Sequence, residues 1–166
     1  MSTTWITRAE SGADSTAVDA VNFHAFGRRL EPDIVLRLRT SNAWIPTLSY
    51  VATRAGEIVA HALLSRCHID ESPALVLGPV AVLPQYQGAG AGSATIRAAL
   101  AAARAEGEHA VVVLGHHEYY PRFGFRQATD SGIHSPYDGP NQMALGLVAE
   151  RILPRGTIRY PTAWEA

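Results

Sequence analysis

Apolar and polar positions in the middle of the chain form short runs typical of β-strands, and turn residues separate these runs. Residues 48–53 and 58–68 are rich in apolar and β-branched side chains, with a hairpin turn at residues 55–57 between them. A second turn at residues 70–73 precedes a third run over residues 75–83. Three consecutive strands joined by tight turns predict an antiparallel meander.

The part before the meander shows helical spacing instead. A short strand over residues 5–9 is followed by a turn and then by residues 15–30, whose apolar positions recur at helical intervals. Residues 33–40 have a pattern compatible with a helix or a strand. The Glu-Pro-Asp sequence before them is a helix start, so we predict a second, short helix there.

Beyond the meander, strong helix formers fill residues 91–106, and residues 110–114 are a run of apolar β-formers. A strand, a helix and a second strand in this order imply a right-handed crossover and a parallel strand pair. The remaining residues predict a short helical turn at 119–123, a loop at 129–140, and strands at 141–148 and 157–161.

No repeat, linker or low-complexity tail divides the chain. Its 166 residues are enough for one domain with a real core. We therefore predict a single mixed α/β (α+β) domain over residues 1–166, with a mostly antiparallel sheet flanked by helices.

Composition excludes several functions. The formal net charge of -1 argues against a general nucleic-acid binder or a protein of anionic membrane surfaces. All 14 basic residues are arginine, so a Schiff-base lysine and a Walker A loop are both impossible. Cys67 is the one cysteine and cannot form an internal disulfide; with no signal peptide and no apolar run of about 20 residues, a cytoplasmic protein is expected.

The stretch from Gly88 to Gly92 reads Gly-Ala-Gly-Ala-Gly between a strand and a helix. The first N–H groups of a helix lack intrahelical acceptors, and small residues let an anion approach them. A tight turn with close helix packing is the alternative. Dinucleotide binding fits poorly, because the last glycine of G-x-G-x-x-G is replaced by Ser93 or Thr95 and the next strand ends in Gly115 rather than an acid. A pyrophosphate ligand remains.

Two motifs resemble a known family. The segment Gln87-Gly88-Ala89-Gly90-Ala91-Gly92 resembles the Q/R-x-x-G-x-G/A signature of the GNAT superfamily of acyl-coenzyme A dependent N-acyltransferases, and it follows a VAVLP strand. The segment GHHEYYPRFGF resembles the superfamily's Y-x-x-x-G-F segment. The resemblance covers most of residues 48–125, and it is greatest to small, uncharacterised bacterial N-acetyltransferases. It implies a parallel strand pair that splays at the acyl-coenzyme A site.

The resemblance also implies a co-substrate, acetyl-coenzyme A (acetyl-CoA), and residues that bind it. Backbone amides would hold its pyrophosphate, strand backbone would pair with its pantetheine arm, and two aromatic residues complete the set. Pro79, which has no N–H, would help to disrupt strand pairing nearby. The amides would be those of Gln87, Gly88, Ala89, Gly90, Ala91, Gly92 and Ser93. The strand residues would be Val80, Ala81 and Val82, and the aromatic residues Tyr119 and Phe123.

For catalysis, the resemblance implies that Tyr120 is the acid that protonates the departing sulfur. It also implies that a backbone N–H in the region 80–82 is the hydrogen-bond donor to the oxyanion. A packing role is the alternative for Tyr120. The base stays open between a water relay and a side chain. His116, His117 and Glu118 are expected to be structural or cofactor-facing, and four weaker candidates are His24, His61, His68 and Asp70. No metal is expected, since His116-His117 lacks helical ligand spacing.

The predicted reaction is direct transfer of an acetyl group from acetyl-CoA to a primary amine in a ternary complex. The alternatives are transfer of another acyl group, a protein or peptide amine as acceptor, or a non-catalytic acyl-CoA binding or regulatory domain. The acceptor site should come from residues 20–45 and the loop at 131–140, with Glu31, Asp33, Asp70 and Asp138 as acids within reach of a cationic amine. A homodimer is possible, with no nucleic-acid or membrane partner expected.

Overall fold

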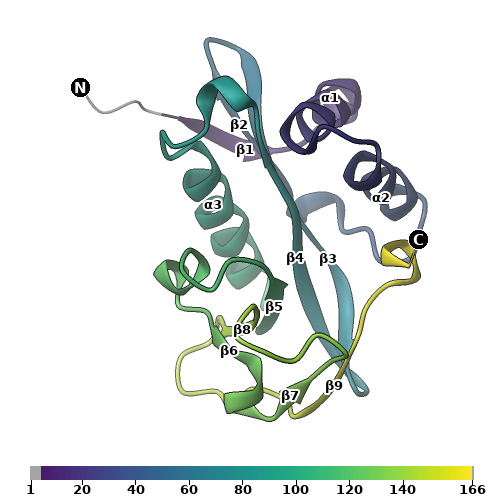
Figure 1. The fold of residues 1–166 in the computed structure, drawn as a ribbon, viewed down its shortest axis with the longest axis vertical. Helices are drawn as coiled ribbons and strands as arrows, with labels where there is room; N and C mark the ends of the chain where they lie inside the picture. Colours follow the sequence, from purple (N-terminus) through teal and green to yellow (C-terminus); the bar gives the residue numbers. More distant parts are fainter. Residues whose placement is uncertain (1–4, 166) are drawn as a thin grey trace.

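Nine strands form one sheet in the computed structural model, which describes residues 5–165 (Figure 1). Their order is β1-β2-β3-β4-β5-β8-β6, and β9 pairs with both β3 and β7. The strands are β1 (Ile6–Ala9), β2 (Ser49–Arg54), β3 (Glu57–Ile69), β4 (Ser72–Val82), β5 (Ala110–Leu114), β6 (Arg126–Gln127), β7 (Ile133–His134), β8 (Gln142–Gly146) and β9 (Gly156–Arg159). The α-helices are α1 (Ser15–Phe26), α2 (Leu30–Arg39) and α3 (Ala91–Ala105).

The predicted meander is confirmed by the antiparallel pairing of β2 with β3 and of β3 with β4. The first hairpin turns over Ala55 and Gly56, which both have positive φ angles, of 50° and 81°. This is the combination that two-residue hairpin turns of type I′ use. The second turn is shorter than predicted, because Pro73 already belongs to β4 and lies opposite His68.

The single helix predicted over residues 15–30 is shorter in the structure, and α1 ends at Phe26. Gly27 adopts a left-handed φ of 68° and donates its N–H to the carbonyl of Phe23, at 2.8 Å. This is a common helix termination by glycine. The next helix, α2, begins at Leu30, earlier than the predicted start at residue 33.

The predicted parallel pair is β4 with β5, and α3 is the crossover helix between them. Leu75 lies opposite Val111 and Leu77 opposite Val113, where the pairing stops although β4 continues to Val82. On the other side, the β3–β4 register shifts between Ala62 and Leu64, which face Val80 and Leu77. This interruption of the β3 pairing falls on Gly78 and Pro79. On its other side, where the pairing with β5 has stopped, β4 has no partner strand within residues 5–165, so residues 78–82 form an edge of β4 that is unpaired on that side.

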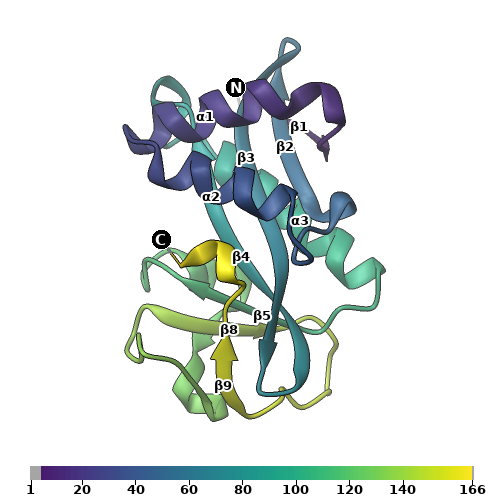
Figure 2. The same ribbon diagram turned by 90° about the vertical axis from the view of Figure 1, so that its right-hand side faces the viewer.

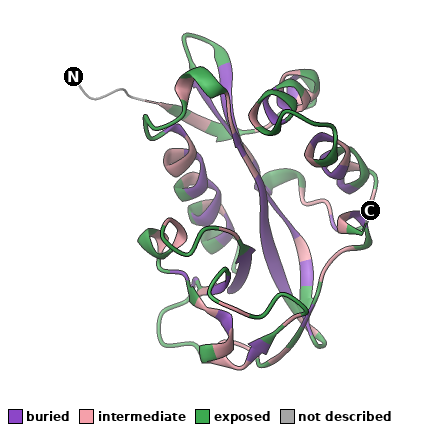
Figure 3. Ribbon diagram, in the orientation of Figure 1, coloured by how far each residue is buried: buried purple, intermediate pink, exposed green. Residues whose placement is uncertain are grey.

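Each face of the sheet carries its own helices (Figures 1 and 2). The face toward α3 is packed with Leu64, Leu75 and Ile96, and the face toward α1 and α2 with Val18, Leu38 and other apolar side chains. The buried residues therefore follow β3 and β4 through the centre of the molecule (Figure 3).

The segment after β5 differs from its prediction. Residues 129–140, predicted as a loop, include most of a 3-10 turn (Ala128–Ser131) and the strand β7, which runs parallel to β9. The last two predicted strands are shorter, at Gln142–Gly146 and Gly156–Arg159. After β9 the chain makes a short 3-10 turn, Thr162–Trp164, which lies beside α2 (Figure 1).

Candidate active site

The loop between β4 and α3 presents a row of free backbone amides. The first α-helical hydrogen bond of α3 runs from the Ala94 N–H to the Gly90 carbonyl, at 3.0 Å. The N–H groups of residues 88–93 donate to no acceptor within residues 5–165. Gly88 and Gly90 have φ angles of 77° and 91°, which few other residues adopt. Together with the helix dipole, these amides are suited to an anion.

Two side chains hold this loop in place. Trp5 Nε1 donates to the Ala89 carbonyl at 3.1 Å, and Gln87 Nε2 donates to the Val82 carbonyl at 3.1 Å. The N–H of Gln87 points at the Pro84 carbonyl, 3.4 Å away, so Gln87 connects the loop to β4 chiefly through its side chain. Because both tethers end on carbonyls, they leave the amide side of the loop unobstructed.

A pocket of about 240 Å³ lies over these amides, and we call it the loop pocket. Gly88, Gly90, Gly92 and other loop residues line it together with Tyr119 and Arg122, and no acidic residue does. The Arg122 guanidinium lies over the Tyr119 ring, 4.3 Å from its centroid, and Nε donates to the Tyr119 carbonyl at 2.8 Å. Arg122 was not predicted from the sequence, and it adds a positive charge to the amides.

The unpaired edge of β4 begins beside this pocket. Leu83 donates its N–H to the Val59 carbonyl of β3, at 2.9 Å. Since N–H groups alternate in direction along a strand, those of Val80 and Val82 point away from β3, toward the side where β5 no longer pairs. Two backbone donors are thus available at the positions predicted for the pantetheine arm and the oxyanion.

A second pocket, of about 480 Å³, lies at the other end of this edge, and we call it the tyrosine pocket. Val80, Gly115, His116 and Tyr120 are among its lining residues. Tyr120 packs tightly on Gly115, where a Cβ atom would come within 2.5 Å of the tyrosine ring. Burial, with a smaller effect of Tyr119, raises the pKa of Tyr120 to about 12, so its hydroxyl stays protonated at neutral pH.

The other aromatic residues of this segment support the two pockets. The Tyr119 hydroxyl and Ser93 Oγ are hydrogen-bonded at 2.8 Å, which joins the start of α3 to the segment after β5. Phe123 lines neither pocket; its ring packs on Tyr119 and lies under the guanidinium of Arg97, 4.9 Å from the ring centroid. Ala81 is buried toward α1 and lies opposite His61 of β3, so by the same alternation its N–H points toward β3 and away from the two pockets.

Of the candidate bases after β5, only His116 lines the tyrosine pocket. His117 Nδ1 lies 2.9 Å from Asn141 Oδ1, and Glu118 is exposed. Among the predicted acids, Glu31 lines the same pocket and is held by Arg28, with Arg28 Nε 2.8 Å from Glu31 Oε1. Most of the predicted cofactor-binding residues, together with Tyr120, therefore line two pockets, one at each end of the unpaired edge, whereas Ala81, Ala89 and Phe123 line neither.

His61 is a buried structural residue. Asn22 Nδ2 donates to the Val18 carbonyl and to His61 Nδ1, at 3.0 and 3.1 Å, so Nδ1 is an acceptor and Nε2 carries the proton. Nε2 then donates to Ser49 Oγ at 2.9 Å, and Ser49 donates to Glu10. Burial, and secondarily Arg39, lowers the pKa of His61 to about 3. A fully buried imidazole of this pKa is a poor base at neutral pH.

The remaining acidic candidates have structural partners. Asp70 Oδ1 accepts the Thr157 N–H at 2.9 Å, Asp33 pairs with Arg29, and Asp138 pairs with His134. Cys67 is buried, which raises the pKa of its thiol to about 12. No group of three potential metal ligands occurs within residues 5–165.

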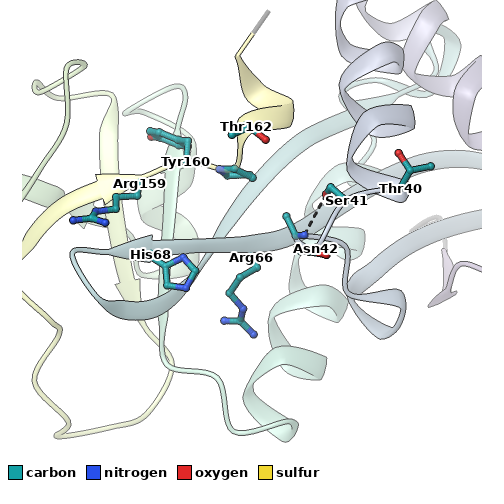
Figure 4. Close-up of a pocket in the computed structure, with 10 residues that line it drawn as sticks. Thr40, Ser41, Asn42, Arg66, His68, Arg159, Tyr160 and Thr162 are labelled. Atoms are coloured by element: carbon teal, nitrogen blue, oxygen red, sulfur yellow. Dashed lines mark hydrogen bonds between the residues drawn. The ribbon is translucent and has the colours of Figure 1, made fainter.

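A further cavity, of about 510 Å³, lies at the edge of β3 and shares no lining residue with either pocket (Figure 4). Residues of β3, of the segment after α2 and of the segment after β9 line it, including Arg66, His68 and Thr162. The Arg66 guanidinium is already held by both oxygens of Glu108, at 2.8 and 2.6 Å. We therefore do not assign this cavity to the reaction.

Comparison with known proteins defines the class. The family model described as "Acetyltransferase (GNAT) family" matches residues 19–125, so the chain belongs to the GNAT family of acetyltransferases, enzymes that use acetyl-CoA as co-substrate. This confirms the predicted family and enzyme class. Between residues 5 and 165, no helix combines the length and apolar character needed to cross a membrane.

Individual relatives agree with this class. The chain is 36% identical over 157 residues to the uncharacterized N-acetyltransferase YjhQ of Escherichia coli K12, covering 89% of this chain and 87% of the relative. A GNAT family acetyltransferase from Brucella melitensis, solved in complex with acetyl-CoA, is 30% identical with a TM-score of 0.82, covering 98% of this chain and 99% of that one.

The fold of the E. coli N-acetyltransferase YhbS, solved in complex with CoA, is also similar. Its TM-score is 0.91 at 23% identity, covering 98% of this chain and 92% of that chain. These similarities confirm the predicted fold of a mixed sheet with a central parallel pair.

Proposed function

We propose that this chain transfers an acetyl group from acetyl-CoA to a primary amine by direct transfer in a ternary complex, within one domain over residues 1–166. The observation that carries the proposal is the arrangement of the two pockets. Free amides and an arginine lie at one end of the unpaired edge of β4, and a partly buried, protonated tyrosine lies at the other. The Brucella relative, which binds acetyl-CoA, supports this assignment.

The residues of the loop pocket fit the diphosphate of acetyl-CoA. The N–H groups of residues 88–93 are free to donate to an anion, Arg122 supplies a positive charge, and the pocket has no carboxylate among its lining residues within residues 5–165. Charge-assisted hydrogen bonds of this kind are stronger than neutral ones. The N–H groups of Val80 and Val82 would then bind the pantetheine arm and the thioester oxygen, so that the thioester lies at the tyrosine pocket.

In the reaction, the nitrogen lone pair of the neutral amine attacks the thioester carbonyl, and a strand N–H stabilises the oxygen as it becomes negative. The C–N bond forms and the C–S bond breaks. Tyr120 donates its hydroxyl proton to the departing sulfur. The proton lost by the amine passes to His116 or to water, and Tyr120 is reprotonated from solvent. The products are an N-acetylated amine and free coenzyme A.

The proposal is tested by binding and by turnover. Acetyl-CoA should raise the melting temperature of the protein, and an Arg122→Gln variant should show a smaller rise at the same concentration. Thiol release from acetyl-CoA should require both the protein and an amine. Stabilisation by acetyl-CoA without thiol release for any amine would instead favour a non-catalytic binding domain.

A further inference from the structure

The tyrosine pocket continues into another cavity, of about 500 Å³, which we call the outer pocket. The two cavities share Leu77, Leu114 and Trp164, and the outer pocket extends to Tyr137 and Tyr160. We call the two together the acceptor cleft. Tyr120 lines this cleft, whereas the loop pocket lies at the other end of the unpaired edge. An amine whose nitrogen reaches the thioester would therefore place the rest of the molecule in the acceptor cleft.

The walls of the acceptor cleft are apolar and open to solvent. Phe26, Leu30, Leu114 and Tyr137 all line it, and they expose 38, 40, 46 and 56% of their surface. Large apolar side chains that gather around a concavity mark a site for an apolar ligand, whereas single exposed ones carry no such meaning. The cleft therefore favours a ligand that covers these side chains.

Trp164 gives the cleft an aromatic wall that has a fixed position. Its ring packs against Gly78, where a Cβ atom would lie only 3.1 Å from the ring carbon Cη2. Gly78 also has a φ of 146°, a conformation that side chains rarely adopt. Because β4 has no side chain at this position, the indole lies directly against the strand and lines both parts of the cleft.

The charged groups of the cleft do not favour a polycation. Glu31 is already paired with Arg28, and Arg159 of the outer pocket is paired with Glu71 at 3.5 Å, so Glu165 is the one acid of the cleft lining without an ion pair within residues 5–165. An acceptor with several ammonium groups would therefore meet a single carboxylate that is not already paired. An acceptor with a single amine and an apolar body would lose little hydration and would cover the exposed walls.

We infer that the acceptor is a monoamine attached to an apolar body of aromatic size, bound with its amine toward Tyr120 and its body between Leu30, Leu114 and Trp164. This inference rests on the proposed function. It predicts that the body of the amine, rather than its charge, determines selectivity.

The test compares three amines at saturating acetyl-CoA and one pH: 2-phenylethylamine, ethanolamine and spermidine. We expect kcat/KM for 2-phenylethylamine to exceed both of the others by about tenfold or more, since small changes in apolar contact already change selectivity by this factor. Leu30→Ser should lower kcat/KM for 2-phenylethylamine about tenfold and change that for ethanolamine little.

Leu36 provides a matched control. It lies on α2 as Leu30 does and is 46% exposed, but it does not line the cleft. Leu36→Ser should leave kcat/KM for both amines unchanged. The circular dichroism spectra of both variants should match that of the unsubstituted protein, which shows that both keep its fold.

Three results would overturn the inference. A higher kcat/KM for ethanolamine or spermidine would refute the apolar acceptor and leave the acetyltransferase assignment intact. Equal losses in Leu30→Ser and Leu36→Ser would show that the cleft does not select the amine. Thiol release with none of the amines, despite stabilisation by acetyl-CoA, would count against both the inference and the proposed function.

Discussion

Replacement of Gly90 by valine tests whether the start of α3 binds the diphosphate. Gly90 precedes the first residue of α3 with a φ of 91°, and a Cβ atom there would lie 3.8 Å from Trp5 Nε1, an ordinary contact. The side chain therefore has space, but the backbone conformation does not suit valine. Such a strained residue costs about 1–3 kcal/mol, which the loop can relieve by moving its amides.

The displacement should mainly weaken binding of acetyl-CoA. A hydrogen bond to a charged group contributes about 1.5–3 kcal/mol, so the loss of one such bond raises the KM for acetyl-CoA about 10- to 150-fold. The KM for the amine should stay nearly constant, because the acceptor cleft does not contain this loop. Both constants can be measured by the release of free thiol with one substrate saturating.

Gly107→Val is the matched control, since Gly107 follows the other end of α3 with a φ of 84° and has no heavy atom near its Cβ position. Both variants should lower the melting temperature, by about 2–4 °C for each kcal/mol of strain. Only Gly90→Val should change the KM for acetyl-CoA. An equal rise for acetyl-CoA and amine, or the same rise in Gly107→Val, would refute the binding role.

Three further predictions concern single residues. Tyr120→Phe should lower kcat about tenfold or more without changing the KM for acetyl-CoA, because it removes a proton donor and keeps the ring; an unchanged kcat would make Tyr120 a packing residue. Burial lowers the pKa of His61 to about 3, from about 6.5 in the unfolded chain, so its contribution to stability is complete above pH 6.5 and is lost as the pH falls. Urea unfolding should therefore show that the free energy of unfolding falls by about 2 kcal/mol between pH 7.5 and pH 5. His61→Gln should lack this loss, and His68→Gln, which replaces an exposed ring, should retain it. Gly156→Ala should lower the melting temperature, because its Cβ atom would lie 2.3 Å from the Asp70 carboxyl group at a φ of 146°; an unchanged value would show that this turn can adjust.

Much of the fold could be predicted because the strongest local signals and the tertiary structure agree. Gly56 marks a hairpin between two apolar runs, and the helix formers of residues 91–105 lie between two strands. Such patterns depend only on residues that are close together in the sequence, so they can be recognised without knowing the rest of the structure. The loop of residues 88–93 could be predicted for the same reason, since its glycines directly precede a helix.

The rest of the site depends on contacts between distant segments. Trp5 reaches Ala89 across 84 positions of the chain, and Trp164 reaches Gly78 from the last turn. Neither contact leaves a periodic pattern. The strand β7 was missed because two paired residues within a polar segment are too few to show alternation. Arg122 could have been noticed, since it lies three residues after Tyr119 and inside a recognised motif.

The position of Trp164 has a consequence for limited digestion of the protein. Arg159 and Tyr160 join β9 to the turn that carries the indole, and a trypsin cut between them would release this aromatic wall while leaving the β4–α3 loop intact. The nicked enzyme should keep its affinity for the acyl donor and lose its discrimination among amines. A single proteolytic cut would thus separate donor recognition from acceptor choice.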